Sequence, residues 1–565
     1  YASYIDEFIN LANIENWEAW TSYIFGGDHP RIWTEQYNNL KKLNGFIAPK
    51  EMTFQPLPRL SRFNFASPAG LALAVGLLFA LAGFFRVWEL GSRSLWTDEA
   101  WVALAALKAS PSEALAAGTS TPPFYMLTLW GLGQLLGGSE AVLRSPSLLF
   151  GMGTLILFWL LARYLTAWPA SITGLVLVGF SPIMVYFSKE LKQYSGDAFF
   201  AVLLFFLVER LLARRGERGW IPLALAGLLG LGFSHTLVFI LPVAGGVLWF
   251  TLPRSRPRLL ILGAVWSLTF AAYYALFFRH QVDPELVVYW AQDFPDFSGV
   301  RAFTWWLGGA WARYFHYFLG EWGVWLGPPL VLAGGAALIK HGGKRALAYF
   351  LGPLLITLVA AAMHRYPFMG HYNGSRLMLF SAPFLYLVAA AGLAAVLTRL
   401  WPRRKAVALA LTGLVLVAFQ PLNLVRENLH PQNNRREIRP LVRYLESQVQ
   451  PQDLVYVYFF AISPVKYYLQ RPLNRVCWGK TCEDTDLALP PGPPPRRVWL
   501  IASHFPDLDY MRKFAWELLG TRWEETACLT QEGAVLFKFE RQEPEIAGQT
   551  GNLRSKLPES ELPIP

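Results

Sequence analysis

Charged residues are scarce in this chain of 565 residues. Only 16% of its residues are Asp, Glu, Lys or Arg, and 54% are hydrophobic, whereas a soluble domain typically contains about 25% charged residues. This composition excludes an ordinary soluble enzyme. Apolar runs of about 17–25 residues recur, and each is long enough to cross a bilayer as a helix. The chain is therefore predicted to be an all-α polytopic membrane protein, to which a small α/β domain is added.

Cysteine is also scarce, with only Cys477, Cys482 and Cys528 in the whole chain. Four residues separate the first two, and this spacing allows a short-loop disulfide in a non-cytoplasmic compartment. Two sulfur ligands in one loop are also compatible with the start of a metal site, but no paired histidines follow them. A structural disulfide and free thiols are the two interpretations that the sequence favours.

The first 58 residues lack the apolar core of a signal peptide and are instead rich in aromatic and polar side chains, among them Trp17, Trp20 and Trp33. We predict a cytoplasmic N-terminal extension over 1–65. It is either a short helical extension or a docking segment for a protein partner, with exposed aromatic residues as anchors.

Eleven membrane helices are expected from the apolar runs. They cover 67–86, 145–164, 168–187, 196–213, 220–234, 236–252, 259–278, 322–340, 346–363, 377–398 and 405–422. The region 220–252 is equally compatible with one long helix or a re-entrant pair. Residues 66–422 thus form the predicted transmembrane domain.

The positions of the basic residues orient these helices. With these spans, every basic cluster lies on one side of the membrane, which is therefore cytoplasmic. The clusters are Arg59/Arg62, Arg163, Arg214/Arg215/Arg218, Arg254/Arg256/Arg258, Lys340/Lys344/Arg345 and Arg399/Arg403/Arg404/Lys405. This distribution accounts for the net charge of +11 without nucleic-acid binding. An odd number of spans then places the N-terminus inside and the C-terminus outside.

Three regions are predicted on the outer face. The loop 87–144 includes an apolar piece from Thr121 that is too short to span and reads as an interfacial helix. The loop 279–321 is dense in Trp and Tyr, which favours the headgroup zone. Residues 423–545 contain strand-like runs and helical patterns that indicate an extracytoplasmic α/β domain, and the tail 546–565 is predicted to be disordered.

Polar motifs follow these apolar segments in a fixed order. Trp96-Thr-Asp98-Glu99 follows the first span, and Pro122-Pro-Phe-Tyr125 lies in the same loop. The second span opens with Glu140-Ala-Val-Leu-Arg144, and the third is followed by Phe187-Ser-Lys-Glu190-Leu-Lys192-Gln-Tyr194. Later come Tyr366-Pro-Phe and Asn373-Gly-Ser-Arg376. Over about 66–425, this ordered set resembles the GT-C-fold glycosyltransferases that use polyprenyl-phosphate sugars, which include protein O-mannosyltransferases and lipid A aminoarabinose transferases.

The resemblance implies an inverting transfer of a sugar to an acceptor hydroxyl on the outer membrane face. The sugar leaves through an oxocarbenium-like transition state. Because the acceptor hydroxyl must lose its proton, the transfer needs a general base near the reacting carbon. The resemblance gives this role to Asp98. Glu99 is expected to position Asp98 or to hold a substrate or metal. The structural explanation for both is that they cap the following helix.

The leaving phosphate needs cationic or hydroxyl groups nearby. By resemblance, Glu190, Lys192 and Tyr194 belong to this site, although Lys192 at an interface also suits headgroup binding. Arg376 enters a span from the outer side and is favoured for phosphate binding, with snorkelling as the alternative. His371 and Tyr125 are further candidates. Arg144 is expected to anchor the interfacial helix, and His235 suits a structural role as well as a functional one.

Two other classes of protein remain open at this stage. Thr121 precedes Pro-Pro where many relatives carry His or Lys, so a non-catalytic GT-C-like accessory subunit of a larger complex is the main alternative. A transporter would show paired repeats, and none is visible. The expected partners are the polyprenyl-phosphate sugar, a lipid, glycan or protein acceptor and the membrane, with no nucleic acid. A divalent metal ion is a candidate cofactor, and a bacterial inner or plasma membrane is the expected location.

Overall fold

The computed structural model describes residues 68–118, 120–280, 288–370, 374–418, 424, 436–479 and 495–542. The predicted extension 1–65, the tail 546–565 and His371 lie outside these residues. Contacts divide the chain into two units, Tyr1–Arg93 with Trp101–Gln432, and Ser94–Ala100 with Asn433–Pro565. Each unit is described here by itself.

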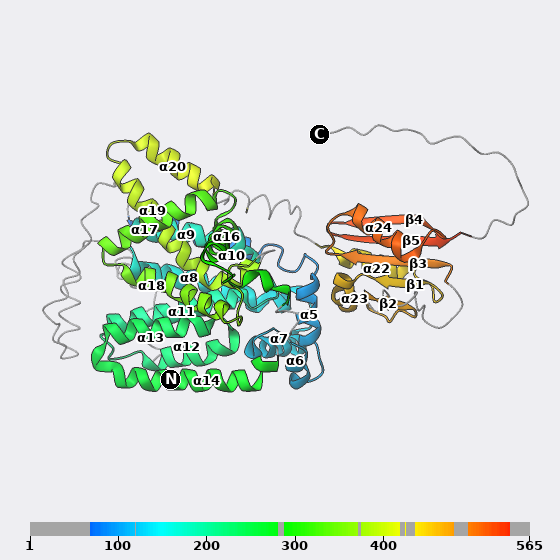
Figure 1. The fold of residues 1–565 in the computed structure, drawn as a ribbon, viewed down its shortest axis with the longest axis horizontal. Coiled ribbons are helices and arrows are strands. Elements are labelled where there is room, and N and C mark those ends of the chain that lie inside the picture. The colour runs from blue at the N-terminus through cyan, green and yellow to red at the C-terminus, as the bar shows by residue number, and fades with distance from the viewer. Residues whose placement is uncertain are drawn as a thin grey trace, which may run out of the picture. The chain divides into compact units, whose positions relative to one another are not determined.

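The first unit is helical over its described residues (Figure 1). In its first half the helices are α4 Pro68–Val87, α5 Thr97–Ala106, α6 Pro111–Ala117, α7 Pro123–Leu136, α8 Glu140–Leu165, α9 Trp168–Gly179, α10 Pro182–Ser188 and α11 Tyr194–Ala213. The later helices are α12 Trp220–Phe233, α13 Leu237–Thr251, α14 Arg256–Leu276, α16 Val300–Leu319, α17 Gly323–Lys340, α18 Lys344–Ala362, α19 Ala382–Leu400 and α20 Lys405–Ala418. Short 3₁₀ segments are η2 Pro253–Ser255, η3 Phe278–His280, η4 Ala291–Asp293 and η5 Gly374–Ser381.

Every predicted span coincides with helical residues, but the number of spans is not confirmed. Six helices in the described part of the chain are long and apolar enough to cross a membrane, or seven if the bent pair α9–α10 is one span. Helices α12 and α13 have only 14 and 15 residues, and at 1.5 Å per residue they fall short of a core about 30 Å thick. They are two helices, joined at Ser234–Thr236, rather than one long one.

Helix α19 forms the centre of the first unit, and α4 lies at its edge. The apolar window that ends in α19 is 89% buried, whereas that of α4 is 22% buried. Leu73, Leu77 and Leu81 form an exposed stripe on α4 at i, i+4 and i+8, as expected for a helix side that faces lipid. Helix α19 crosses α17 so closely that a Cβ at Gly334 would clash with the Val388 carbonyl. Small residues commonly allow such close helix packing in membranes.

A buried arginine fixes the bend between α9 and α10, which is 54°. Arg86 is fully buried at the end of α4 and donates to the carbonyl oxygens of Gly179 at 2.7 Å and Val178 at 3.0 Å. The last carbonyls of a helix have no partner within that helix. Arg86 therefore caps α9 where the chain turns, and this contact compensates for the burial of its charge.

A salt bridge with a buried carboxylate joins α11 to α18. Arg345 donates to both carboxylate oxygens of Glu209, at 2.6 and 2.8 Å, and the Tyr349 hydroxyl donates to Glu209 at 2.7 Å. The Glu209 side chain is 2% exposed. A paired fork geometry of this kind is the strong form of a charged hydrogen bond. It explains how α11 carries a carboxylate among apolar helices.

The second unit contains a five-stranded sheet with the order β2-β1-β3-β5-β4 (Figure 1). Its strands are β1 Leu454–Val457, β2 Val476–Trp478, β3 Arg497–Ser503, β4 Trp523–Gln531 and β5 Ala534–Arg541. Strand β1 pairs in parallel with β2 and β3, and β5 pairs antiparallel with β3 and β4. The helices are α22 Ile438–Gln448, α23 Ile462–Tyr468 and α24 Leu508–Leu519, with a 3₁₀ turn η6 at Phe459–Ala461.

Both faces of this sheet are covered, because alternate residues of a strand point to opposite sides. Val455 and Val457 of β1 pack with α22 and α23, whereas Leu454 and Tyr456 pack with Met511 of α24. The predicted small sheet near the C-terminus is thus present. Cys477 in β2 is disulfide-bonded, Cys528 in β4 is a free thiol, and Cys482 lies outside the described residues.

Candidate functional site

Arg376 lies in η5 and faces the start of α11 in the first unit. Its guanidinium carbon lies 5.8 Å from the centre of the Tyr194 ring, a distance at which a cation is attracted to an aromatic face. Tyr194 is only 6% exposed. The sequence motifs that contain these two residues are far apart in the chain, and the fold brings them together.

Tyr317 of α16 joins this pair. Desolvation raises the pKa of the Tyr317 hydroxyl well above its usual value, and the charge of Arg376 acts against this rise. Glu190 and the phenols of Tyr186 and Tyr194 add to the rise. Groups that act on one another's titration lie within a short electrostatic range. We call Tyr186, Glu190, Tyr194, Tyr317 and Arg376 the Arg376 cluster.

Glu190 lies in the short link between α10 and α11 and is 1% exposed. The link begins at Lys189, whose carbonyl accepts a hydrogen bond from Arg93 at 3.2 Å. The Arg93 guanidinium also lies 5.0 Å from the Tyr186 ring centre. A cation from the start of the loop 87–144 therefore supports the link, although the sequence indicated no role for Arg93.

The other end of the link is held through Tyr125. This residue is fully buried, and its hydroxyl lies 2.8 Å from the Ser147 hydroxyl, which donates to the Lys192 carbonyl at 2.9 Å. Tyr125 thus supports the backbone that carries Lys192, and its role as a phosphate ligand stays a prediction. The Lys192 side chain is half-buried.

The segment before Arg376 is packed tightly. A Cβ at Gly374 would clash with the Trp290 ring, so only glycine allows this approach. Met369 has a φ of 50°, which is uncommon for a residue with a side chain, and Arg313 donates to its carbonyl at 3.2 Å. The chain is thus held in a strained conformation just before the residues that lead to Arg376.

Arg144 holds the start of the loop that follows the first predicted span. It is fully buried in α8 and donates to the carbonyl oxygens of Leu90 at 3.0 Å and Arg93 at 2.9 Å. These residues begin the loop after the first span. These bonds hold the start of the loop, and a role of Arg144 in anchoring α7, the predicted interfacial helix, stays a prediction.

Asp98 and Glu99 occupy the first turn of α5 and belong to the second unit. Asp98 is half-buried and Glu99 is fully buried. Their place in the first turn suits the helix dipole. Because α5 begins at Thr97, neither carboxylate occupies the N-cap position that the capping explanation assigns to it, and Asp98 is partly accessible. The structure thus brings Glu190, Tyr194 and Arg376 together in one unit and places the acidic pair in the other.

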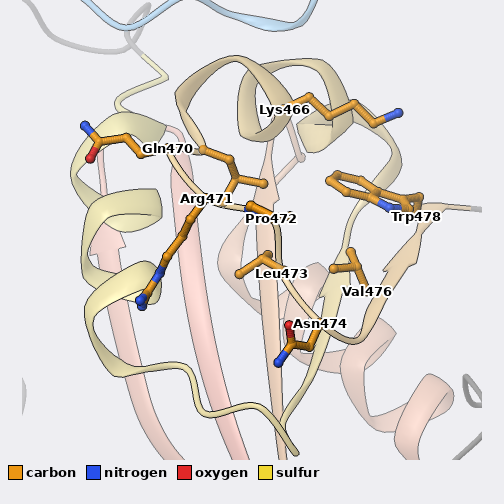
Figure 2. A pocket seen from close by; sticks show the side chains of 9 residues that line it. Lys466, Gln470, Arg471, Pro472, Leu473, Asn474, Val476 and Trp478 are labelled. Carbon is orange, nitrogen blue, oxygen red and sulfur yellow. The ribbon is translucent and has the colours of Figure 1, made fainter.

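The second unit also contains an open depression of about 490 Å³ along the connection from α23 to β2 (Figure 2). The Lys466 ammonium lies 4.8 Å from the Trp478 ring centre, and Asn474 lies at the other end. An aromatic face with a few polar groups is the usual lining of a small-molecule site. No motif of the sequence pointed to this depression.

Asp197 is a further buried carboxylate that the sequence motifs did not single out. It is 4% exposed and accepts a hydrogen bond from the Ser234 hydroxyl at 2.5 Å. It lies one helical turn after Tyr194 in α11. A carboxylate so near the start of an apolar helix was the sequence signal that could have identified it. Its bonds tie the start of α11 to the turn between α12 and α13.

The described residues contain no group of three or more His, Cys, Asp or Glu side chains arranged to hold a metal ion. The expected divalent metal therefore stays a prediction, and Glu99 is the acidic residue that the sequence analysis offers for it.

No protein-family profile matches the chain, and no curated protein matches it in sequence. Among solved structures, it is similar to ArnT from Cupriavidus metallidurans, in the apo state and bound to undecaprenyl phosphate. These two share 13% identity with the chain, cover 84% of it and 98% of their own length, and have TM-scores of 0.48 and 0.47.

The oligosaccharyltransferase AglB from Archaeoglobus fulgidus, solved with an inhibitory peptide and a dolichol-phosphate, is 12% identical. It covers 71% of the chain and 60% of its own length, with a TM-score of 0.40. Both proteins have the GT-C fold, the resemblance that the sequence motifs indicated. Since the identities are this low and the TM-scores are below 0.5, this likeness assigns no activity, substrate or residue role to the chain.

Proposed function

We propose that this protein is a membrane glycosyltransferase that moves a sugar from a polyprenyl phosphate to an acceptor hydroxyl. The observation that supports this most directly is the Arg376 cluster. It gathers a guanidinium, a buried carboxylate and three phenols, and its members Glu190, Tyr194 and Arg376 come from two motifs that are far apart in the sequence. A cation with hydroxyl groups around it suits a phosphate that gains charge as its bond to the sugar breaks.

In the proposed reaction, the acceptor oxygen attacks the anomeric carbon of the sugar. The bond from this carbon to the phosphate oxygen breaks, and its electron pair stays with the phosphate, beside Arg376. The acceptor proton passes to the Asp98 carboxylate, which acts as general base. Attack on the face opposite to the leaving phosphate inverts the configuration at the anomeric carbon.

We propose that both substrates meet the protein at the outer face of the membrane. The lipid tail of the donor stays in the bilayer, so its phosphate must meet the protein where the helices end. We infer that the N-terminus is cytoplasmic and that the α/β domain is extracytoplasmic, because the basic clusters then share the cytoplasmic side.

The test is Asp98→Asn in the full chain, purified and reconstituted into vesicles with a panel of polyprenyl-phosphate hexoses and pentoses. Release of polyprenyl phosphate is measured. We expect turnover to fall by at least ~10²-fold, the low end of general-base contributions, with unchanged thermal unfolding. Glu113→Gln is the matched control, since Glu113 is exposed in α6. Wild-type turnover in Asp98→Asn would remove Asp98 from the reaction.

A wild-type chain that binds polyprenyl phosphate but transfers no sugar with any donor of the panel would favour the accessory-subunit alternative. In that case, Arg376→Ala should still weaken binding of the lipid, because phosphate recognition would persist without chemistry.

A further inference from the structure

Four consecutive residues before Asp98 are each attached to the sheet unit. Residues Ser94–Ala100 belong to this unit by their contacts, although the rest of the unit begins at Asn433. We call Ser94, Leu95, Trp96 and Thr97 the anchored segment. Side-chain and backbone groups of the sheet unit hold every one of them, and α5 starts directly after with Asp98 in its first turn.

The first two residues of the anchored segment are held through their backbone N–H groups. The Glu437 carboxylate accepts from the Ser94 hydroxyl at 2.9 Å and from the Ser94 N–H at 3.3 Å. The Tyr468 hydroxyl accepts from the Leu95 N–H at 2.7 Å. Ser94 and Leu95 are buried, so an N–H that lost its acceptor there would stay unsatisfied away from water.

The next two residues of the anchored segment contact residues that follow the parallel strands β3 and β1. The Trp96 ring stacks on His504, which follows β3, with centroids 5.9 Å apart and planes at 13°. Arg436 lies over the same ring at 5.3 Å. The Thr97 hydroxyl donates to the carbonyl of Phe460, which follows β1.

Their location is informative. In open α/β sheets, ligands bind outside the carboxyl ends of the strands. Here that edge, at Phe460 and His504, holds the protein's own anchored segment. His504 has a φ of 59°, a left-handed conformation that His and Asn tolerate better than most residues, and this places its ring next to Trp96.

We propose that the sheet unit positions the catalytic base: Glu437, Tyr468 and His504 fix the anchored segment and thereby the direction of Asp98. This inference rests on the proposed function for the role of Asp98. The sheet unit is then part of the active site through its positioning residues, rather than only a module for acceptor recognition.

The experiment uses the full chain in vesicles with three variants, Tyr468→Phe, His504→Asn and Glu437→Ala. Tyr468→Phe removes one acceptor, and His504→Asn removes the ring while it keeps a residue that tolerates a left-handed backbone. Tyr510→Phe is the matched control, because Tyr510 is 45% exposed on α24 of the same unit. Each sample is measured by hydrogen exchange of the peptide over 94–106, by binding of undecaprenyl phosphate and by turnover.

We expect exchange at 94–100 to rise roughly 10-fold or more in each variant. Tyr468→Phe and Glu437→Ala remove a buried acceptor, His504→Asn removes the ring stacked on Trp96, and either loss should allow local opening. Turnover should fall by about the same order through kcat, with undecaprenyl phosphate affinity unchanged, since Arg376 lies in the other unit. Glu437→Gln should restore part of the loss, because its amide oxygen still accepts. A merely structural role would lower the amount of folded protein but not kcat per folded molecule.

Unchanged exchange in Tyr468→Phe and His504→Asn would overturn the proposal, and so would raised exchange with wild-type kcat. If the wild-type chain shows no transfer with the whole donor panel, the proposed function fails and the positioning of a catalytic base fails with it. Raised exchange in the variants would then show only that the sheet unit holds the anchored segment, with no catalytic base for it to position. The two failures are distinguished by whether the wild-type chain turns over.

Discussion

Replacement of Arg376 should weaken binding of the donor lipid far more than it weakens folding. Arg376 is half-buried in η5, and the face of Tyr194 orients its guanidinium. A hydrogen bond to a charged group is worth about 1.5–3 kcal/mol. At about 1.4 kcal/mol for each factor of ten, Arg376→Ala should raise the dissociation constant for polyprenyl phosphate by roughly 10- to 150-fold.

The series of variants tests the geometry as well as the charge. Arg376→Lys should recover only part of the loss, because an ammonium lacks the planar fork that grips two phosphate oxygens. Lys192→Ala should weaken binding in the same direction. If both cations hold one phosphate, the loss in the double variant should be smaller than the sum of the single losses by more than about 0.5 kcal/mol.

The assay is titration of the purified chain in vesicles with undecaprenyl phosphate, at fixed ionic strength. Arg301→Ala is the control, because Arg301 is exposed on α16 of the same unit. Normal binding by Arg376→Ala, together with loss of turnover in Asp98→Asn, would place the phosphate elsewhere. His371 would then be the first candidate to test.

Three further predictions concern topology, redox state and stability. In a Cys528→Ser background, Glu217→Cys should be protected from an impermeant thiol reagent in intact cells and Asp509→Cys should react; both positions are exposed, and the opposite pattern would reverse the inferred orientation. Denatured wild-type chain should show one alkylatable thiol before reduction and three after it, because Cys477 is disulfide-bonded and Cys528 is free; three thiols without reductant would contradict the disulfide. Tyr349→Phe should lower stability in detergent by about 1.5–3 kcal/mol, since its hydroxyl donates to the Glu209 carboxylate, while turnover per folded molecule stays unchanged; a loss of kcat at full stability would refute a purely structural role.

Local patterns predicted the elements of this fold well. The apolar runs coincide with helices because burial and backbone hydrogen bonding in a membrane leave few alternatives. The strand-like runs at Leu454 and Arg497 became β1 and β3, which are buried on both faces. The number of eleven spans is not confirmed: six or seven helices of the described part of the chain are long and apolar enough to cross a membrane, and α12 and α13 have only 14 and 15 residues. An apolar stretch of sequence shows that a segment can lie in the membrane, but the length of each helix depends on where the chain breaks, as it does at Ser234–Thr236.

Pairings between distant segments were beyond the reach of the sequence. Ser94 and Glu437 are 343 positions apart, and neither has a local signal for the other. Arg86 resembled an ordinary charge at the end of a span until the fold placed it under the last carbonyls of α9. Arg376 and Tyr194 were both singled out from motifs, but their contact depends on how η5 packs on α11. The motifs indicate which residue types can take part in the chemistry, whereas tertiary packing determines which of these residues lie close together.

The order of synthesis gives the anchored segment a further consequence. The chain passes between its two units three times, at Arg93–Ser94, Ala100–Trp101 and Gln432–Asn433. A ribosome adds about 5–20 residues per second, so Ser94 precedes its partner Glu437 by roughly 20–70 seconds. During that interval the groups of the sheet unit that hold the anchored segment have not yet been made. On the proposed positioning, a prematurely terminated chain would lack these groups, and transfer would require the last domain to fold around a segment made long before it.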